Sequence, residues 1–110
     1  MNKKYDVVWS DIAENDLIDI VQFINNDSHS SALNLFRKFR NRAKSLYQSP
    51  HRGRIIPELR ECGIVQYREL IISHWRLMYR IVNKQVYIIA VIDGRQNVED
   101  VLLRRLIRRQ

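Results

Sequence analysis

The segment from Tyr67 to Arg95 constrains the fold most, because it reads as three consecutive β-strands joined by short polar links. β-Branched and aromatic residues dominate the three runs, and the links Ser73-His74 and Asn83-Lys84 are each a single dipeptide. Links of that length join neighbouring antiparallel strands, so the chain is expected to contain a β-meander. The predicted strands are Val65–Ile72, Trp75–Val82 and Gln85–Ile92.

Arginines recur inside these otherwise apolar strands. Arg76 and Arg80 lie in one strand at even spacing, so their side chains share a face with that of Met78. The opposite face carries Trp75, Leu77, Tyr79 and Ile81, which suits packing on a core. Because arginine is rarely buried unless it is paired, we expect the first face to offer its arginines to an anionic partner.

Two helices are predicted before the meander. Tyr5–Trp9 is a short β-rich run, after which Ser10 or Asp11 caps a helix with an apolar stripe at helical spacing. The turn-forming segment Asn25–Ser28 separates this helix from a second one, Ser30–Gln48. A link this short predicts an antiparallel helical hairpin that covers one face of the sheet.

Two further elements flank the meander. The run Ile55–Arg60 contains Pro57 and is predicted to be an edge strand, because proline cannot donate to a sheet. A last helix is predicted over Asn97–Arg109. The order β-α-α-β-β-β-β-α describes one α+β domain over residues 1–110. We expect an antiparallel sheet, the N-terminal helical hairpin on one face and a C-terminal helix.

The charge is unevenly distributed along the chain. The net charge is +7, yet residues 1–27 hold two bases against six acids, and residues 28–110 hold 17 bases against six acids. Fourteen of the 19 bases are arginines, which favours contacts with carboxylates or phosphates. Such surfaces bind nucleic acid, acidic protein segments or anionic membranes, although a basic protein without a nucleic-acid partner is an open alternative.

Several classes of protein are disfavoured by composition. No apolar run approaches the roughly 18 residues of a membrane span, and the N-terminal residues lack the apolar core of a signal peptide. We therefore expect a cytoplasmic protein without a membrane partner. Cys62 is the single cysteine, and the three histidines lack metal-ligand spacing. No metal and no cofactor are expected.

Catalysis without a metal would depend on arginine and a few proton carriers. A metal-independent ribonuclease needs a base, an acid and arginines on the phosphate. The candidate residues are Arg52, Arg54, Arg60, Arg68, Arg76, Arg80, Arg95 and His74. Glu69 is a further titratable group in these strands, but an ion pair on the sheet surface is its simpler interpretation.

Four stretches of the chain, taken in order, resemble the RelE/ParE superfamily of bacterial toxins. They are VVWSDIAENDLIDIVQFI, SPHRGRIIPELR, YRELIISHWRLMYRI and VYIIAVIDGRQNVEDVLLRRL, and the resemblance extends from residue 7 to residue 106, nearly the whole chain. The resemblance implies a small α+β toxin of a type II toxin–antitoxin system, associated with growth inhibition and plasmid stabilisation. It also implies an antitoxin, encoded beside the toxin, that wraps and neutralises it in a hetero-oligomer.

The superfamily divides by target. RelE-like members are ribosome-dependent mRNA endonucleases. Membership of this branch would assign cleavage to five residues, Arg68, Arg76, Arg80, Arg95 and His74. After Arg95, however, the tail QNVEDVLLRRLIRRQ has no Tyr, His or Lys to assist cleavage. The strand end DGR followed by a further helix favours the ParE-like branch, whose members inhibit DNA gyrase without chemistry of their own. A plain nucleic-acid-binding domain is a third hypothesis.

The last helix supplies the predicted contact residues. Its arginines are assigned to the target, and apolar side chains on this helix and on the meander are assigned to the antitoxin. The target-binding candidates are Arg104, Arg105, Arg108 and Arg109, and the antitoxin-binding candidates are Trp75, Leu102, Leu103 and Leu106. For Trp75 a place in the core is an equally good interpretation. We expect the helix to be needed for toxicity and the sheet to fold without it.

Overall fold

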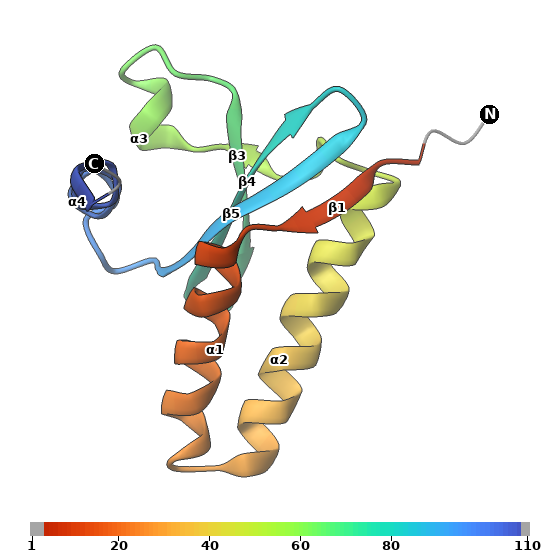
Figure 1. Ribbon diagram of the computed structural model, residues 1–110, viewed down its shortest axis with the longest axis vertical. Coiled ribbons are helices and arrows are strands. Elements are labelled where there is room, and N and C mark those ends of the chain that lie inside the picture. Colours follow the sequence, from red (N-terminus) through yellow and green to blue (C-terminus); the bar gives the residue numbers. More distant parts are fainter. Residues whose placement is uncertain (1–3, 109–110) are drawn as a thin grey trace.

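The protein is built on a five-stranded sheet with the strand order β1-β5-β4-β3-β2 (Figure 1). The computed structural model describes the backbone of residues 4–108 and the side chains of residues 4–105. The strands are β1 (Asp6–Trp9), β2 (Arg54–Ile55), β3 (Tyr67–Ile72), β4 (Trp75–Val82) and β5 (Gln85–Asp93). β3, β4 and β5 form the predicted antiparallel meander. Ser73 and Asn83 adopt positive φ angles in its two turns, as short hairpin links require.

The sheet is mostly antiparallel, as predicted, with one parallel pair at its β1 edge. β1 pairs with β5 in parallel, in a register that aligns Asp6 with Gln85 and Trp9 with Ile88. The local pattern of Tyr5–Trp9 predicts a strand but carries no information about its neighbour. β1 occupies the free edge of β5, which is the last strand of the meander.

The helical hairpin covers one face of the sheet, as predicted. It consists of α1 (Asp11–Asn25) and α2 (His29–Lys44), with a 3₁₀ turn at Ser45–Tyr47. Ser10 caps α1 by accepting a hydrogen bond from the backbone N–H of Ala13, and Ser28 caps α2 in the same way. The main core lies between hairpin and sheet, and its buried residues include Leu17, Phe39, Leu46, Ile72, Leu77 and Tyr79.

The opposite face of the sheet is also covered in part. α3 (Pro57–Arg60) and α4 (Val98–Arg108) lie on this side and contact each other (Figure 1). A second cluster of buried residues forms here from Ile56, Met78, Ala90, Ile92, Val98 and Val101. Because α4 supplies two of them, the packing argues against our expectation that the sheet folds without this helix. No helix in the described part of the chain is long and apolar enough to cross a membrane.

The prediction of an edge strand over Ile55–Arg60 is correct at Ile55 and wrong for the residues that follow. The structure ends β2 at Ile55, and Pro57 opens the one-turn helix α3. Proline lacks a backbone donor and its fixed φ suits the first position of a helix, so the same residue that limits a strand begins a helix here. Val65 also falls outside β3, which begins at Tyr67.

A bulge in β5 changes which side chains face the second cluster. Met78 of β4 pairs with Ala90, whereas Tyr79 pairs with Ile88, so Ile89 is an extra residue in β5. Ile89 packs against the second cluster together with the adjacent Ala90, although neighbouring strand residues normally face opposite sides. The bulge therefore adds one apolar side chain to the face that carries α3 and α4.

Tyr79 fixes the loop before β2 to the main core. Its buried hydroxyl donates to the carbonyl of Pro50 at 2.7 Å and accepts from the N–H of Gly53 at 2.9 Å. Burial raises the pKa of this phenol. A Cβ atom at position 53 would lie 2.6 Å from the carbonyl oxygen of Glu69, so only glycine fits beside β3. This contact places β2 and, after it, α3.

Candidate binding groove

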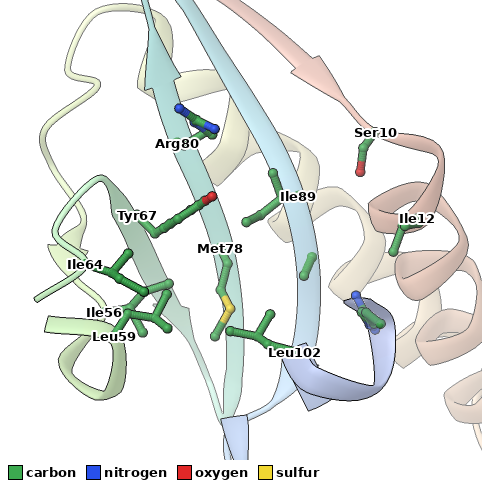
Figure 2. Close-up of a pocket in the computed structure, with 12 residues that line it drawn as sticks. Ser10, Ile12, Ile56, Leu59, Ile64, Tyr67, Met78, Arg80, Ile89 and Leu102 are labelled. Atoms are coloured by element: carbon green, nitrogen blue, oxygen red, sulfur yellow. The ribbon is translucent and has the colours of Figure 1, made fainter. Parts of the chain in front are cut away.

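An open groove with a volume of about 470 Å³ lies on the face of the sheet that carries α3 and α4. Figure 2 shows its lining side chains, which come from segments far apart in the sequence. They are Ser10, Ile12, Ile56, Leu59, Ile64, Tyr67, Met78, Arg80, Ile89, Ala90, Leu102 and Arg105. The lining is mainly apolar, two arginines are present, and no acidic residue is among these twelve.

The groove has an apolar floor between two walls. Met78 and Ile89 rise from the sheet, with Leu59 of α3 on one side and Leu102 of α4 on the other (Figure 2). An exposed apolar concavity of this kind marks a binding site more often than a plain solvated surface. The bulge at Ile89 contributes directly, because it turns this side chain toward the groove.

Arg80 brings to the groove a buried hydrogen-bond donor that has no partner in the described structure. Its guanidinium lies 5.5 Å from the ring of Tyr67, a cation–π contact that orients the side chain (Figure 2). Its Nε atom is buried and has no hydrogen-bond partner in the described part of the structure. Buried polar groups without partners are rare, and this donor is desolvated without a compensating bond in the described structure.

Arg76 lies on the same sheet face but is fully engaged in an ion-pair network. It donates to both oxygens of Glu69 at 2.6 and 2.9 Å and to both oxygens of Glu58 at 2.7 and 2.9 Å. Arg54 adds a further bond to Glu69 at 2.7 Å. Glu69 is buried, with 0% of its side chain exposed, which corrects the surface ion pair expected for it. The network joins α3 to the sheet and so supports one wall of the groove.

Stability should fall in acid because of Glu58. The hydrogen bonds from Arg76 lower the pKa of Glu58 from 4.5 to about 2. Between these two pH values the carboxylate of Glu58 binds fewer protons in the folded protein than in the unfolded chain. The stability that Glu58 contributes is therefore fully present above pH 4.5 and is lost as the pH falls toward 2. In Glu58→Gln, the free energy of unfolding should depend less on pH between these values. Glu61→Gln, a change at an exposed neighbour, should keep the wild-type slope, and equal slopes in all three proteins would contradict the assignment.

The five predicted catalytic residues do not form one site. Arg68 lies on the hairpin face of the sheet, where it donates to the carbonyl of Gly53 at 2.6 Å. Arg80 lies in the groove. His74, Arg76 and Arg95 come together around a separate shallow depression of about 300 Å³. There Arg95 binds both oxygens of Asp93 through two hydrogen bonds, at 2.6 and 2.9 Å.

The predicted target-binding arginines of α4 also differ from one another. Arg105 forms an ion pair with Asp16 of α1 at 2.9 Å, and Asp16 also accepts from the N–H of Val91. Arg104 is exposed. The side chain of Arg108 and the whole of Arg109 lie outside the described residues. Arg105 thus anchors α4 to α1, whereas Arg104 is available to a partner.

The predicted antitoxin-binding residues are distributed over both faces. Leu102 lines the groove, and Leu103 is 56% exposed on the same helix. Trp75 packs against the main core on the hairpin side, so the core interpretation of this residue holds. The side chain of Leu106 lies outside the described part of the helix.

Sequence reasoning missed several groove residues, including Tyr67, Ile89 and Leu59. Their residue types are ordinary for a sheet or a helix, and no local pattern separates a groove-lining isoleucine from a core isoleucine. The unusual feature that was visible is the arginine at position 80, on the same face as Met78.

Comparisons with known proteins agree with this fold. Residues 7–98 match the family model of the ParE toxin of the type II toxin–antitoxin system, parDE. The solved structure of a chromosomal ParDE TA system from P. aeruginosa is similar, with a TM-score of 0.68 and 18% sequence identity, covering 83% of this chain and 97% of that chain. Similarity at that identity supports the fold alone. No curated protein matches the chain significantly. The family match spans most of the sequence, and the chain therefore belongs to the ParE toxin family of type II toxin–antitoxin systems.

Proposed function

We propose that this chain stops growth by binding to DNA gyrase and inhibiting it, and that a cognate antitoxin neutralises it. The observation that carries the proposal is the match of residues 7–98 to the ParE toxin family. The toxin acts by protein contact and does no chemistry of its own. Its action therefore requires an exposed surface complementary to the target, and not a catalytic centre.

The exposed side of α4 is the proposed target contact. Arg104 is exposed there, and Leu103 beside it leaves 56% of its surface in solvent. Arginine is enriched among the residues that dominate binding at protein interfaces, an exposed leucine adds apolar surface that a partner can bury, and the positive charge speeds association. The net charge of +7 adds electrostatic steering toward an acidic surface.

A ribosome-dependent mRNA endonuclease is the alternative. The grouping of His74, Arg76 and Arg95 at the shallow depression favours it. However, Arg76 and Arg95 are already paired with carboxylates, and a scissile phosphate would have to compete with Glu58 and Asp93 for them. This competition makes the depression a poor phosphate site, and the gyrase proposal is preferred.

The purified chain is expected to block supercoiling of relaxed plasmid by DNA gyrase. The double substitution Arg104→Gln and Arg108→Gln should raise the concentration needed for half inhibition at least about tenfold, the effect of losing about 1.4 kcal/mol of binding energy. Arg37→Gln with Lys38→Gln removes the same charge from the exposed side of α2 and is the matched control. The readout is the fraction of supercoiled plasmid on a gel.

The same protein should leave mRNA intact in a translating ribosome mixture. If mRNA is cleaved while gyrase stays active, the proposal fails and the endonuclease is correct. In cells, induced expression should stop DNA synthesis before protein synthesis, and the reverse order would also contradict inhibition of gyrase.

A further inference from the structure

We propose that the end of α2 and the loop at residues 49–54 bind the phosphate backbone of duplex DNA. Four bases make up this basic site, and they are Arg42, Lys44, Arg52 and Arg68. The site goes beyond inhibition of gyrase by protein contact, because it would hold the toxin on nucleic acid. It also lies apart from the proposed target contact, since α4 and the end of α2 are on opposite sides of the molecule (Figure 1).

The segment from Ser28 to Pro57 carries bases without acids. It holds five arginines and two lysines, and no aspartate or glutamate. In the part of the chain that the structure describes, two of these bases have a carboxylate partner, since Arg40 pairs with Glu14 and Arg54 pairs with Glu69. The other bases leave uncompensated positive charge on α2 and on the loop, and such a surface attracts polyanions.

The loop is held in one conformation by neutral contacts. The carbonyl of Ser49 accepts a hydrogen bond from the N–H of Arg52 at 3.1 Å, which closes a β-turn. The hydroxyl of Tyr79 donates to the carbonyl of Pro50 and accepts from the N–H of Gly53. Because this backbone is already fixed, a partner that binds here orders little more of the chain.

Two arginines lie against this loop and use neutral acceptors. Arg52 donates to the hydroxyl of Ser45, at the end of α2, over 3.2 Å. Arg68 donates to the carbonyls of Gly53 at 2.6 Å and of His51 at 3.3 Å. Neither arginine has a carboxylate partner among the described residues, so each has an uncompensated charge and further N–H groups that can bind a phosphate.

The surroundings of the site suit a duplex better than a protein or a single strand. No apolar side chain of residues 37–54 is exposed, whereas a protein interface needs apolar anchors. The aromatic side chains of this segment are buried or half-buried, so the bases of a single strand would find no exposed ring for stacking. Contacts with a duplex backbone need neither feature. The choice of DNA over duplex RNA rests on the proposed function, because gyrase acts on DNA.

Arg37 and Lys38 lie outside the proposed contact. Lys38 precedes Lys44 by six residues, which is about 9 Å along the helix axis. Charges on the surface are largely screened beyond about 8 Å at physiological salt. Arg37 and Lys38 therefore add to the attraction of DNA at low salt and are not counted as phosphate contacts.

The test measures binding of a short fluorescent DNA duplex to the full chain at several salt concentrations. The logarithm of the association constant should fall with the logarithm of the salt concentration, with a slope of about −3 to −4 for four phosphate contacts. Arg52→Gln should reduce the size of this slope by about 1, because one contact is lost. The matched control is Arg60→Gln, which removes an exposed arginine of α3 and should keep the wild-type slope.

A second measurement locates the contact in the wild-type protein. After labelling with nitrogen-15, the backbone amide signals of residues 44–54 should shift on addition of the duplex, and those of α3 should not. Shifts confined to other residues overturn the proposal, as does a wild-type slope in Arg52→Gln. An equal loss in Arg60→Gln also overturns it, because net charge alone would then explain the binding. Tighter binding of duplex RNA, or equal competition by polyglutamate, overturns the choice of DNA.

Failure of this inference and failure of the proposed function are distinguishable. If the chain binds DNA through Arg52 and does not inhibit gyrase, the gyrase target is wrong and the basic site stands. If the chain inhibits gyrase and Arg52→Gln binds DNA as well as wild type does, the basic site is wrong and the gyrase target stands.

Discussion

Replacing Arg76 with methionine is expected to lower the free energy of unfolding by about 3–5 kcal/mol. The side chain of Arg76 is 8% exposed and that of Glu69 is 0% exposed, and the two share two hydrogen bonds. Without Arg76, Glu69 would keep a single partner, Arg54, whose own side chain is 56% exposed. A buried carboxylate with too few donors is the expected cause of the loss. Denaturant unfolding followed by circular dichroism measures it.

The double substitution Arg76→Met with Glu69→Met is the decisive control. It removes the buried charge together with its partner, and apolar side chains of similar volume can pack in their place. We expect the double variant to recover most of the lost stability. Arg54→Gln alone should cost about 1 kcal/mol, because buried Glu69 keeps both of its hydrogen bonds from Arg76 and loses one bond only. If the double variant is less stable than Arg76→Met, the network stabilises the fold through its hydrogen bonds, and neutralisation of the buried charge is not the cause.

Truncation after Gly94 is expected to remove the cooperative folding of the domain. The deletion takes away Val98 and Val101, which are 2% and 5% exposed, and it uncovers Met78 and Ile92 on the sheet. Loss of two buried valines costs about 3–6 kcal/mol at about 1.5–3 kcal/mol each. That is a large part of the 5–15 kcal/mol that stabilises a typical domain. The truncated chain should bind a hydrophobic dye and unfold without a sharp transition.

Two full-length variants show whether packing is the cause. Val101→Ala should destabilise the domain by about 1–3 kcal/mol through the cavity it leaves. Leu103→Ser, at a side chain that is 56% exposed, should change stability by no more than about 0.5 kcal/mol. A truncated chain that unfolds like the full one would show that α4 is not part of the core. In that case the helix could be studied as a separate contact element.

Much of the fold could be read from local pattern. The meander, the cap of the first helix at Ser10 and the helical hairpin all depend on signals within a few residues, and these predictions are confirmed. The alternation in β4 also assigned its two faces correctly, with Leu77 and Tyr79 on the main core and Met78 on the opposite face. The superfamily resemblance came from motifs spread along the chain, and the family match confirms it.

The candidate site was only partly predictable. Arg76 and Arg80 were expected to act together because they share a face and a strand. The structure separates them, since Glu58 arrives from α3 and Glu69 from β3 to occupy Arg76. Acidic partners from other elements leave no trace in the alternation of a single strand. The groove itself is formed by residues of six helices and strands and of the loops between them, so no single segment of the sequence could have indicated it.

The sequence by itself therefore determined the elements, most of their order in space and the membership of the family. These follow from periodicity, turn chemistry and motifs, which are properties of neighbouring residues. Only the tertiary structure decided the parallel pairing of β1, the bulge that brings Ile89 to the groove, and which arginine lacks a carboxylate. Each of these features depends on residues that are far apart in the sequence and close together in the fold. The free energy of a buried charge in particular is set by the charged and polar groups packed around it.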